Sequence, residues 1–587
     1  MRERIVHMRV LVVSLVVLGA TLDLPAQVGE YAPVTDAVLL NPGPANWIHF
    51  RRTIDGQGYS PLNQINRQNV QNLQLVWSWA LHPGASEPTP HVYNGIMFIS
   101  NPGGGVQALD AASGDLLWDW KVTTASTDRS SPGGAGPGNL AIADPMRNLA
   151  FYGDKVFTAT GRDQGALLVA LDARTGAVSW QKRVGYRHTA GPIAVKGKVI
   201  VGTNGCEQYK TDDPPCFIAG FDPNTGRELW RTSTIARPGE PGGDTWDDLP
   251  LMFRAGGDVW QSGSYDPRTN LTYWGTAQPK PWARFQRGTD GDALYTNSTL
   301  ALDVDTGKLA WHFQHLPGDT TDSDEAFERL LIDYDGKSSV FSMGKLGVLW
   351  ENDRGTGAFR AAHDLGYQDL ISIDPKTGRA AYFPDKIPRP GVELKACSSI
   401  GGFRAWRAMA YHPATRAVYI PLNLTCRTAT YESQPERVVG GGGLGRTIAT
   451  SSRFHPESPR TLGEFVSMDI RTGGINWRYR TPTPMNTSAL TTGGGLVIVG
   501  DFDRNVYFFD ANTGKLLYRT RMPSPTNGTP TTFAVRGRQY IAIPVGTGST
   551  GIWTSVPEQL TPDKMSQPYA ERMNGVFVFA LGDAPPR

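Results

Sequence analysis

One short pattern recurs along most of this chain and limits the folds that it can adopt. In its clearest copy, Asp303 ends an apolar run, Gly307 closes a short polar run, and Trp311 follows four residues later. Glycine readily takes a positive φ, so the pattern predicts a strand, a tight turn and a second strand. Further copies are Asp110 to Trp118, Asp172 to Trp180, Asp222 to Trp230, Asp374 to Tyr382, Asp469 to Trp477 and Asp510 to Tyr518, with an eighth, Asp353 to Gly357, that lacks the aromatic residue.

Such a unit is too small to bury its own apolar face, so repeated units must pack on one another. The sequence therefore predicts one closed array over residues 45–583, although 587 residues alone would suggest about four domains. We predict an all-β propeller with eight blades, in preference to seven or six. The repeat tryptophans are expected to dock between blades and not to contact a ligand.

Two details refine this prediction. The copies at Asp353 and Asp374 lie too close together for two four-stranded blades, so one of them should be an extra hairpin. The runs LQLVWSWAL (73–81) and NGVFVFAL (574–581) both read as strands. We expect them to share the closing blade, because joining the two ends of the chain leaves no open edge.

The N-terminal residues and the composition indicate the cellular compartment in which the protein resides. Residues 1–26 carry three arginines, then an apolar run over 10–20, then small residues, which predicts a secretory signal peptide; a retained membrane anchor is the alternative. No other run predicts a membrane span, so we expect a periplasmic protein. The formal charge of +2 provides no basic field for nucleic acid or an anionic membrane.

The four cysteines form two pairs that are local in the sequence. In an oxidising compartment they allow the disulfides Cys206–Cys216 and Cys397–Cys426, although spacing alone does not establish either. No Cys-x-x-Cys-His occurs, so the chain attaches no c-type haem.

Three long blocks carry a resemblance to a known family. SPLNQINRQNVQNLQLVW (60–77), ELWRTSTIARPGEPGGDTW (228–246) and GSYDPRTNLTYWGTAQPKPW (263–282), together with the tryptophan repeats, resemble the pyrroloquinoline quinone (PQQ)-dependent alcohol dehydrogenases. The resemblance extends from about residue 45 to residue 581. It implies an eight-bladed, secreted or periplasmic enzyme that binds PQQ and one metal ion and oxidises an alcohol to an aldehyde or ketone.

Alcohol oxidation of this kind needs a base for the hydroxyl proton, a hydride acceptor and a Lewis acid. The resemblance implies the metal ligands Glu207, Gln278, Asp322 and Asp324, with Asp322 also acting as the base. Gln278 stands where the family has an asparagine, which puts its role as a ligand in question. Because Asp324 adds a carboxylate, as in lanthanide-using members, a lanthanide is favoured and calcium is the alternative. Without the family, these residues would read as solvated loop side chains.

The resemblance also implies a quinone site. Trp260 matches the tryptophan on which the quinone stacks, and Arg147 and Lys345 match cations beside the quinone oxygens. The other implied cofactor contacts are Glu87, Thr189, Asn204, Gly205 and Cys206. Two further features depart from the family: RSSPGGAGPGNLAIADP (129–145) lacks the adjacent cysteines that cover the quinone, and Ala405 replaces an asparagine.

The implied partners are a small alcohol and a soluble c-type cytochrome that accepts the electrons, and a homodimer is among the assemblies left open. Two alternatives remain at this stage. The protein could oxidise a sugar, a polyol or an aldehyde with the same cofactor, or it could be a non-catalytic propeller scaffold of the cell envelope.

Overall fold

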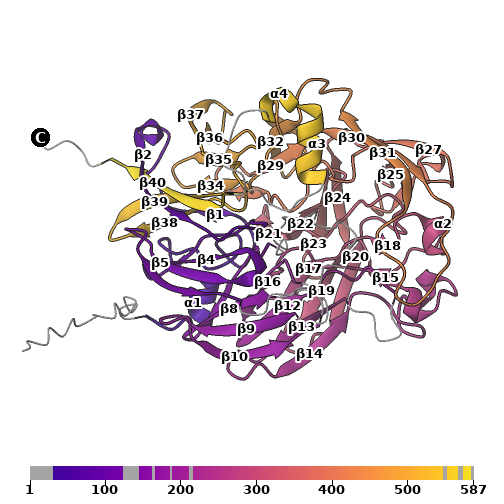
Figure 1. The fold of residues 1–587 in the computed structure, drawn as a ribbon, viewed down its shortest axis with the longest axis horizontal. Coiled ribbons are helices and arrows are strands. Elements are labelled where there is room, and N and C mark those ends of the chain that lie inside the picture. Colours follow the sequence, from indigo (N-terminus) through magenta and orange to yellow (C-terminus); the bar gives the residue numbers. More distant parts are fainter. Residues whose placement is uncertain are drawn as a thin grey trace, which may run out of the picture.

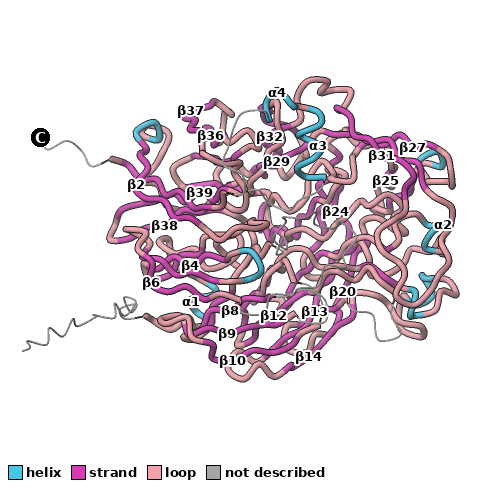
Figure 2. The backbone as a smooth tube through the Cα atoms, in the orientation of Figure 1, coloured by secondary structure: helices cyan, strands magenta, loops and turns pink. Residues whose placement is uncertain are grey.

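The computed structural model describes residues 31–122, 145–160, 166–185, 188–209, 216–546, 552–565 and 573–582. The predicted signal peptide and all of 129–145 except Pro145 lie outside these ranges. Strands and loops make up nearly all of the described chain, and its helices are short (Figure 2). No helix in the described ranges is long and apolar enough to span a bilayer.

Eight sheets of four or five strands account for most of the described strands. The first four are β3 (His91–Tyr93), β4 (Ile96–Ser100), β5 (Val106–Asp110) and β6 (Leu116–Trp120); β7 (Ala150–Tyr152), β8 (Lys155–Thr160), β9 (Leu167–Asp172) and β10 (Val178–Arg183); β11 (Ile193–Val195), β12 (Lys198–Gly202), β13 (Phe217–Phe221) and β14 (Glu228–Ser233); and β16 (Ser264–Asp266), β17 (Leu271–Gly275), β19 (Ser298–Asp303) and β20 (Leu309–Gln314). Neighbouring strands within these sheets pair antiparallel.

The second four sheets complete the set. They are β21 (Leu330–Tyr334), β22 (Lys337–Met343), β23 (Val348–Asp353) and β24 (Phe359–Asp364); β28 (Ala410–His412), β29 (Ala417–Asn423), β32 (Gly463–Asp469) and β33 (Ile475–Thr481); β34 (Leu490–Thr492), β35 (Leu496–Gly500), β36 (Asn505–Asp510) and β37 (Leu516–Arg521), with β1 (Tyr59–Ser60) added parallel to β34; and β38 (Thr531–Val535), β39 (Arg538–Val545), β40 (Gly575–Leu581) and β2 (Leu73–Ala80).

Smaller elements lie beside these sheets. Three further sheets are β15 (Ala255–Gly256) with β18 (Pro279–Lys280), β25 (Ile371–Ile373) with β26 (Ala380–Tyr382), and β27 (Glu393–Cys397) with β30 (Thr425–Tyr431) and β31 (Thr447–Phe454). The helices are α1 (Asp36–Leu40), α2 (Arg284–Arg287), α3 (Ile552–Leu560) and α4 (Pro562–Met565), with 3-10 turns at Val70–Asn72, Pro102–Gly104, Gly243–Trp246, Leu251–Phe253 and Pro384–Lys386.

The repeated turn forms as its sequence predicts. The Asp303 carboxylate accepts the backbone N–H of Thr306 at 2.9 Å, and Gly307 has a φ of 72°. A Cβ atom on Gly307 would lie 2.4 Å from the ring of Trp230 in the preceding sheet, so only glycine allows the indole to pack there. The same docking lets each indole N–H donate to a carbonyl in the next sheet's turn: Trp77 to Ala111, Trp118 to Ala173, Trp180 to Pro223, Trp230 to Val304, Trp311 to Arg354 and Trp477 to Ala511. The predicted structural role of these tryptophans is confirmed.

Packing joins the eight sheets into a closed ring. Buried apolar side chains from consecutive sheets share core clusters: Phe98 with Phe157 and Val201, Ile200 with Leu300, Tyr273 with Val340, Phe341 with Val418, Tyr419 with Val497, Ile498 with Ile541, and Phe533 with Val92. The last of these joins the final sheet to the first. In Figure 1 the sheets accordingly follow one another around the view in sequence order. The all-β propeller is therefore confirmed.

Both refinements of the prediction hold. β2 and β40 pair antiparallel in one sheet, for example Leu73 with Leu581, so the two ends of the chain close the ring. The extra hairpin is the copy at Asp374, which forms β25 and β26, whereas Asp353 lies in the turn between β23 and β24. Both expected disulfides are also present, with Cα atoms 5.6 Å apart at Cys206–Cys216 and 4.2 Å apart at Cys397–Cys426.

Candidate active site

The loop between β20 and β21 presents an acidic residue in an unusual backbone conformation. Asp322 has a φ of 62°, in the left-handed region that few residues other than glycine adopt. The Asp319 carboxylate fixes this geometry, because it accepts the backbone N–H groups of Thr321 at 2.9 Å and Ser323 at 2.7 Å. The hydroxyl of Tyr382, on the extra hairpin, donates to the same carboxylate. Backbone strain held by its surroundings is frequent at functional sites.

Lys345, in the turn after β22, bridges two aspartates of this loop. Its Nζ lies 3.0 Å from Asp322 Oδ1 and 2.8 Å from Asp324 Oδ2, and all three side chains are buried. Burial raises the pKa of Asp322 to about 8, with a further contribution from the charge of Asp324, although Lys345 opposes the rise. The cluster therefore combines two carboxylates, one ammonium and little solvent.

Gln278 completes this side of the site. Its Nε2 donates to Asp322 Oδ1 at 2.6 Å, and its backbone N–H donates to Asp324 Oδ1 at 3.2 Å. Its Oε1 is buried and has no hydrogen-bond partner. An acceptor oxygen left unpaired beside two carboxylates suits a cation, which needs no donor hydrogen.

Glu207 approaches the site from the turn after β12. Its Oε1 lies 3.1 Å from Nζ of Lys280, which follows Gln278 by two residues. The same Nζ lies 2.8 Å from Asp258 Oδ2, and the other oxygen of Asp258 accepts the N–H groups of Gly205 at 2.6 Å and Cys206 at 3.1 Å. Lys280 is fully buried, whereas the Glu207 side chain is 32% exposed.

The residues predicted to contact the quinone form a connected group. Arg147 pairs with Glu87 at 2.6 Å and donates to the carbonyl oxygen of Trp260 at 3.2 Å. The ring of Trp260 lies 5.9 Å from Lys345 Nζ, so it borders the acidic cluster. Asn204 donates to Thr189 Oγ1 at 2.8 Å, while its own Oδ1 is buried without a hydrogen-bond partner.

The structure brings Asp322, Asp324, Lys345 and Gln278 into one contact cluster beside the ring of Trp260. The Glu207 carboxylate instead pairs with Lys280. The sequence reading missed Asp258, Lys280 and the support that Tyr382 gives to Asp319. A lysine between two prolines in the block AQPKPW was a readable signal for Lys280, because that block is otherwise apolar or uncharged.

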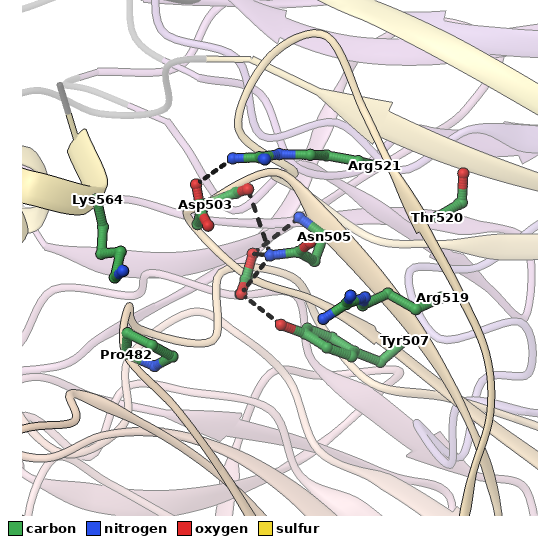
Figure 3. Close-up of a pocket in the computed structure, with 9 residues that line it drawn as sticks. Pro482, Asp503, Asn505, Tyr507, Arg519, Thr520, Arg521 and Lys564 are labelled. Atoms are coloured by element: carbon green, nitrogen blue, oxygen red, sulfur yellow. Dashed lines mark hydrogen bonds and ion pairs between the residues drawn. The ribbon is translucent and has the colours of Figure 1, made fainter. Parts of the chain in front are cut away.

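A cleft of about 440 Å³ on the sheet β34–β37 shares no residue with this site. It is lined by Asp501, Asp503 and Asn505 and by Lys564 of α4 (Figure 3). Its acids already have partners: Asp501 accepts from Tyr507 at 2.8 Å, and Asp503 pairs with Arg521 at 2.8 Å.

Comparisons with known proteins agree with this arrangement. Residues 47–359 and 453–541 match the family described as "Glucose/ethanol/alcohol dehydrogenase, beta-propeller domain". The quinohemoprotein alcohol dehydrogenase ADH IIB of Pseudomonas putida is 31% identical over 91% of this chain and 77% of its own length. The dehydrogenase subunit of the quinone alcohol dehydrogenase of Gluconacetobacter polyoxogenes is 32% identical over 86% of this chain and 72% of its own length.

A solved structure described as a europium-containing methanol dehydrogenase superposes with a TM-score of 0.82 at 25% identity, covering 93% of this chain and all of the other. The match to the family model and the similarity to these relatives place the propeller in the quinoprotein class. The chain belongs to the family of PQQ-dependent alcohol dehydrogenases. It is an oxidoreductase of CH–OH donors, and this membership replaces the scaffold alternative.

Proposed function

We propose that this protein oxidises an alcohol to an aldehyde or ketone in a site that holds PQQ against one metal ion. The observation that carries the proposal is the convergence of Asp322, Asp324, Lys345 and Gln278 beside the ring of Trp260. The proposed metal ligands are Glu207, Gln278, Asp322 and Asp324, and the proposed PQQ contacts are Glu87, Arg147, Thr189, Asn204, Gly205, Cys206, Trp260 and Lys345.

The residues present fit both groups. Asp322, Asp324 and the unpaired Oε1 of Gln278 offer neighbouring oxygens of the kind that a hard cation binds, and Glu207 is proposed to add a third carboxylate. The half-buried ring of Trp260 and the unpaired Oδ1 of Asn204 supply a face and a polar contact for a planar, polar cofactor. When bound, PQQ accepts the two electrons of the alcohol and the metal polarises its reactive carbonyl.

Asp322 is the proposed general base. Its Oδ1 lies in the buried cluster, 2.6 Å from Gln278 Nε2 and 3.0 Å from Lys345 Nζ, where a carboxylate can accept the proton of an alcohol hydroxyl held beside it. Lys345 lies between Asp322 and Trp260, where its ammonium can stabilise negative charge that develops beside the ring. Arg147, held by Glu87 and hydrogen-bonded to the carbonyl oxygen of Trp260, is proposed to do the same.

We favour a lanthanide over calcium as the metal. Asp324 adds a carboxylate to the donor set, and each added anion gains more attraction from a trivalent than from a divalent ion. The similarity to the europium-containing methanol dehydrogenase supports this choice. Calcium is the alternative.

Electrons are proposed to leave to a soluble c-type cytochrome, since the sequence contains no haem attachment motif. Relatives named quinohemoproteins support a haem partner for this chemistry. We further propose that residues 1–26 direct the chain to the periplasm. The homodimer stays a prediction, which light scattering of the purified protein would test.

One experiment separates the substrate and metal alternatives. The purified protein is supplied with PQQ and either La³⁺ or Ca²⁺, and reduction of a dye is followed with primary alcohols, secondary alcohols, sugars, polyols and aldehydes. We expect alcohol-dependent reduction that is faster with La³⁺. Turnover of sugars or aldehydes alone would contradict the proposed substrate class, and faster turnover with Ca²⁺ would contradict the proposed metal.

A further inference from the structure

We infer that Asp258 and Lys280 form a neutral, buried clamp that positions Glu207 for the metal. The inference rests on the proposed function, in which Glu207 is a ligand, and it assigns a role to two residues outside that ligand set. It concerns position and not chemistry, because neither residue is proposed to touch the substrate or to transfer a proton.

The clamp holds both the backbone and the side chain of the turn that carries Glu207. Asp258 accepts the backbone N–H groups of Gly205 and Cys206, so it fixes the two residues before the glutamate. Lys280 contacts Asp258 Oδ2 at 2.8 Å and Glu207 Oε1 at 3.1 Å, so it fixes the glutamate's carboxylate. The Asp258–Lys280 ion pair therefore fixes the positions of three consecutive residues, Gly205, Cys206 and Glu207.

The clamp is itself rigidly placed. β15 and β18 pair Ala255 with Lys280 and Gly256 with Pro279, which brings the segments before Asp258 and around Lys280 together. Asp258 is 1% exposed and Lys280 is 0% exposed, so water does not compete for their contact. The disulfide of Cys206 with Cys216 anchors the same turn from its other side.

Charge explains why an ammonium can stand next to a metal ligand. A lone lysine beside Glu207 would repel a cation, but Asp258 lies closer to the ammonium than Glu207 does and balances its charge. The pair therefore leaves the net charge of the donor set nearly unchanged. It adds directional hydrogen bonds to a ligand whose side chain is 32% exposed and would otherwise be free to rotate.

A purely structural ion pair is the competing explanation. Such a pair would stabilise the 204–207 turn, yet its removal would leave metal affinity unchanged in molecules that fold. The two explanations therefore differ in a binding measurement that needs no turnover.

The test is calorimetric titration of La³⁺ into the PQQ-loaded protein. The variant Asp258→Asn/Lys280→Met keeps the net charge and leaves an Asn oxygen to accept the Gly205 and Cys206 N–H groups, but it removes the ammonium from Glu207. We expect La³⁺ to bind at least tenfold more weakly. The matched control Asp305→Asn/Lys198→Met removes an exposed ion pair of 2.9 Å and should bind as wild type does.

A second pair of measurements shows whether the clamp variant weakens La³⁺ binding by displacing Glu207. Glu207→Gln should weaken La³⁺ binding by itself, and adding the clamp variant to it should weaken binding by less than threefold more, since coupled residues are not additive. A full tenfold additional loss would overturn the inference. If the methionine variant does not fold, Asp258→Asn/Lys280→Gln carries the test, with at least a fivefold loss expected.

The outcomes also separate this inference from the proposed function. If the wild type binds neither La³⁺ nor Ca²⁺, or Glu207→Gln binds as the wild type does, the metal assignment fails and the inference fails with it. If the wild type binds, Glu207→Gln weakens binding and the clamp variant binds normally, only the inference is overturned.

Discussion

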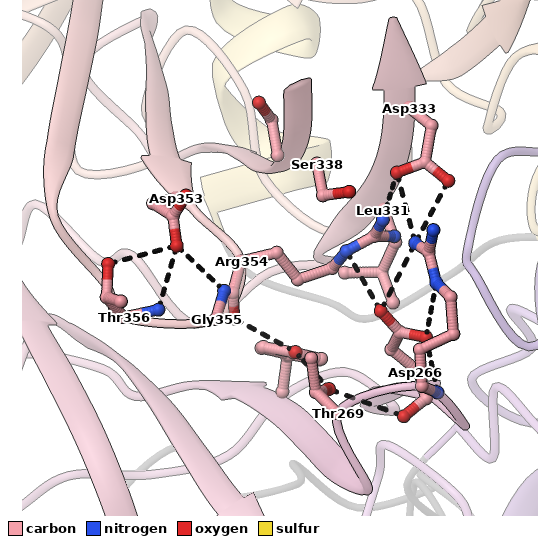
Figure 4. A network of polar contacts seen from close by, with 12 residues as sticks. Asp266, Thr269, Leu331, Asp333, Ser338, Asp353, Arg354, Gly355 and Thr356 are labelled. Carbon is pink, nitrogen blue, oxygen red and sulfur yellow. Dashed lines mark hydrogen bonds and ion pairs between the residues drawn. The ribbon is translucent and has the colours of Figure 1, made fainter. Parts of the chain in front are cut away.

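Two aspartates that lie 19 positions apart in the sequence, Asp303 and Asp322, show how differently this fold uses the same side chain. Asp303 lies in the repeated turn, where its carboxylate accepts the N–H groups of Asp305 at 3.2 Å and Thr306 at 2.9 Å. Partial burial opposes ionisation, but hydrogen bonds from Thr306 and Asn270 outweigh it and lower the pKa of Asp303. Figure 4 shows the same turn at Asp353, which accepts from Gly355 and Thr356.

Asp322 has the opposite surroundings. Its Oδ1 is contacted by the side chains of Gln278 and Lys345, and burial with the nearby charge of Asp324 raises its pKa to about 8. Backbone donors therefore make an aspartate a fixed anion, whereas burial keeps it able to exchange a proton. The opposite pKa shifts therefore distinguish the turn aspartates, which stabilise the fold, from Asp322, which is the proposed catalytic base.

The largest expected effect comes from Asp322→Asn. An amide cannot accept the alcohol proton, so we expect kcat to fall by about 10²- to 10⁴-fold at PQQ and metal concentrations that saturate the variant. Steady-state dye reduction measures the loss, and calorimetry checks binding of the metal. The control is Asp303→Asn, which should retain kcat within about twofold because a turn residue takes no part in proton transfer. If Asp322→Asn kept full turnover with PQQ and the metal bound, Asp322 would not be the general base.

A smaller effect is expected at Asp501, a buried aspartate outside the site. Burial raises its pKa from 3.8 to about 6, although Tyr507 and Asn505 donate hydrogen bonds to it. The unfolded chain therefore ionises at lower pH than the folded protein does, and folding loses about 2 to 3 kcal/mol as pH rises from about 4 to 6. The loss is complete above about pH 6.

Asp501→Asn should therefore unfold at a higher temperature than the wild type above pH 6 and at a similar temperature near pH 4, without loss of kcat. The difference between the two proteins in thermal unfolding across pH 4 to 7 isolates this group. A constant difference would show that Asp501 is ionised throughout.

The smallest effect is expected for Asp303→Ala. Removing the acceptor leaves the turn's N–H groups to water, at a cost of about 1 kcal/mol in the free energy of unfolding. Denaturant unfolding measures this cost, and kcat per folded molecule should be unchanged. A fall in kcat as large as that of Asp322→Asn would show that turn and site aspartates are not functionally separate.

The sequence by itself determined the ring and its closure. Every copy of the turn carries its own glycine, and most carry the aromatic residue that docks on the next unit, so short-range spacing sufficed to predict the strands, the extra hairpin and the closing pair β2–β40. The family resemblance predicted site roles for Asp322, Asp324 and Lys345, and the structure places these three side chains in contact. The turns and their strands depend on residues that are close in the sequence, whereas the pairing of β2 with β40 follows from the need to close the ring.

Only the tertiary structure decided which distant groups meet. The contact of Lys280 with Asp258 and Glu207 joins three segments separated by up to 73 residues, and no local spacing encodes it. The same holds for Asp319 and Tyr382, which are 63 residues apart. Pairing of buried charges depends on closing the ring and excluding water, because the same side chains would stay solvated and independent in an open chain.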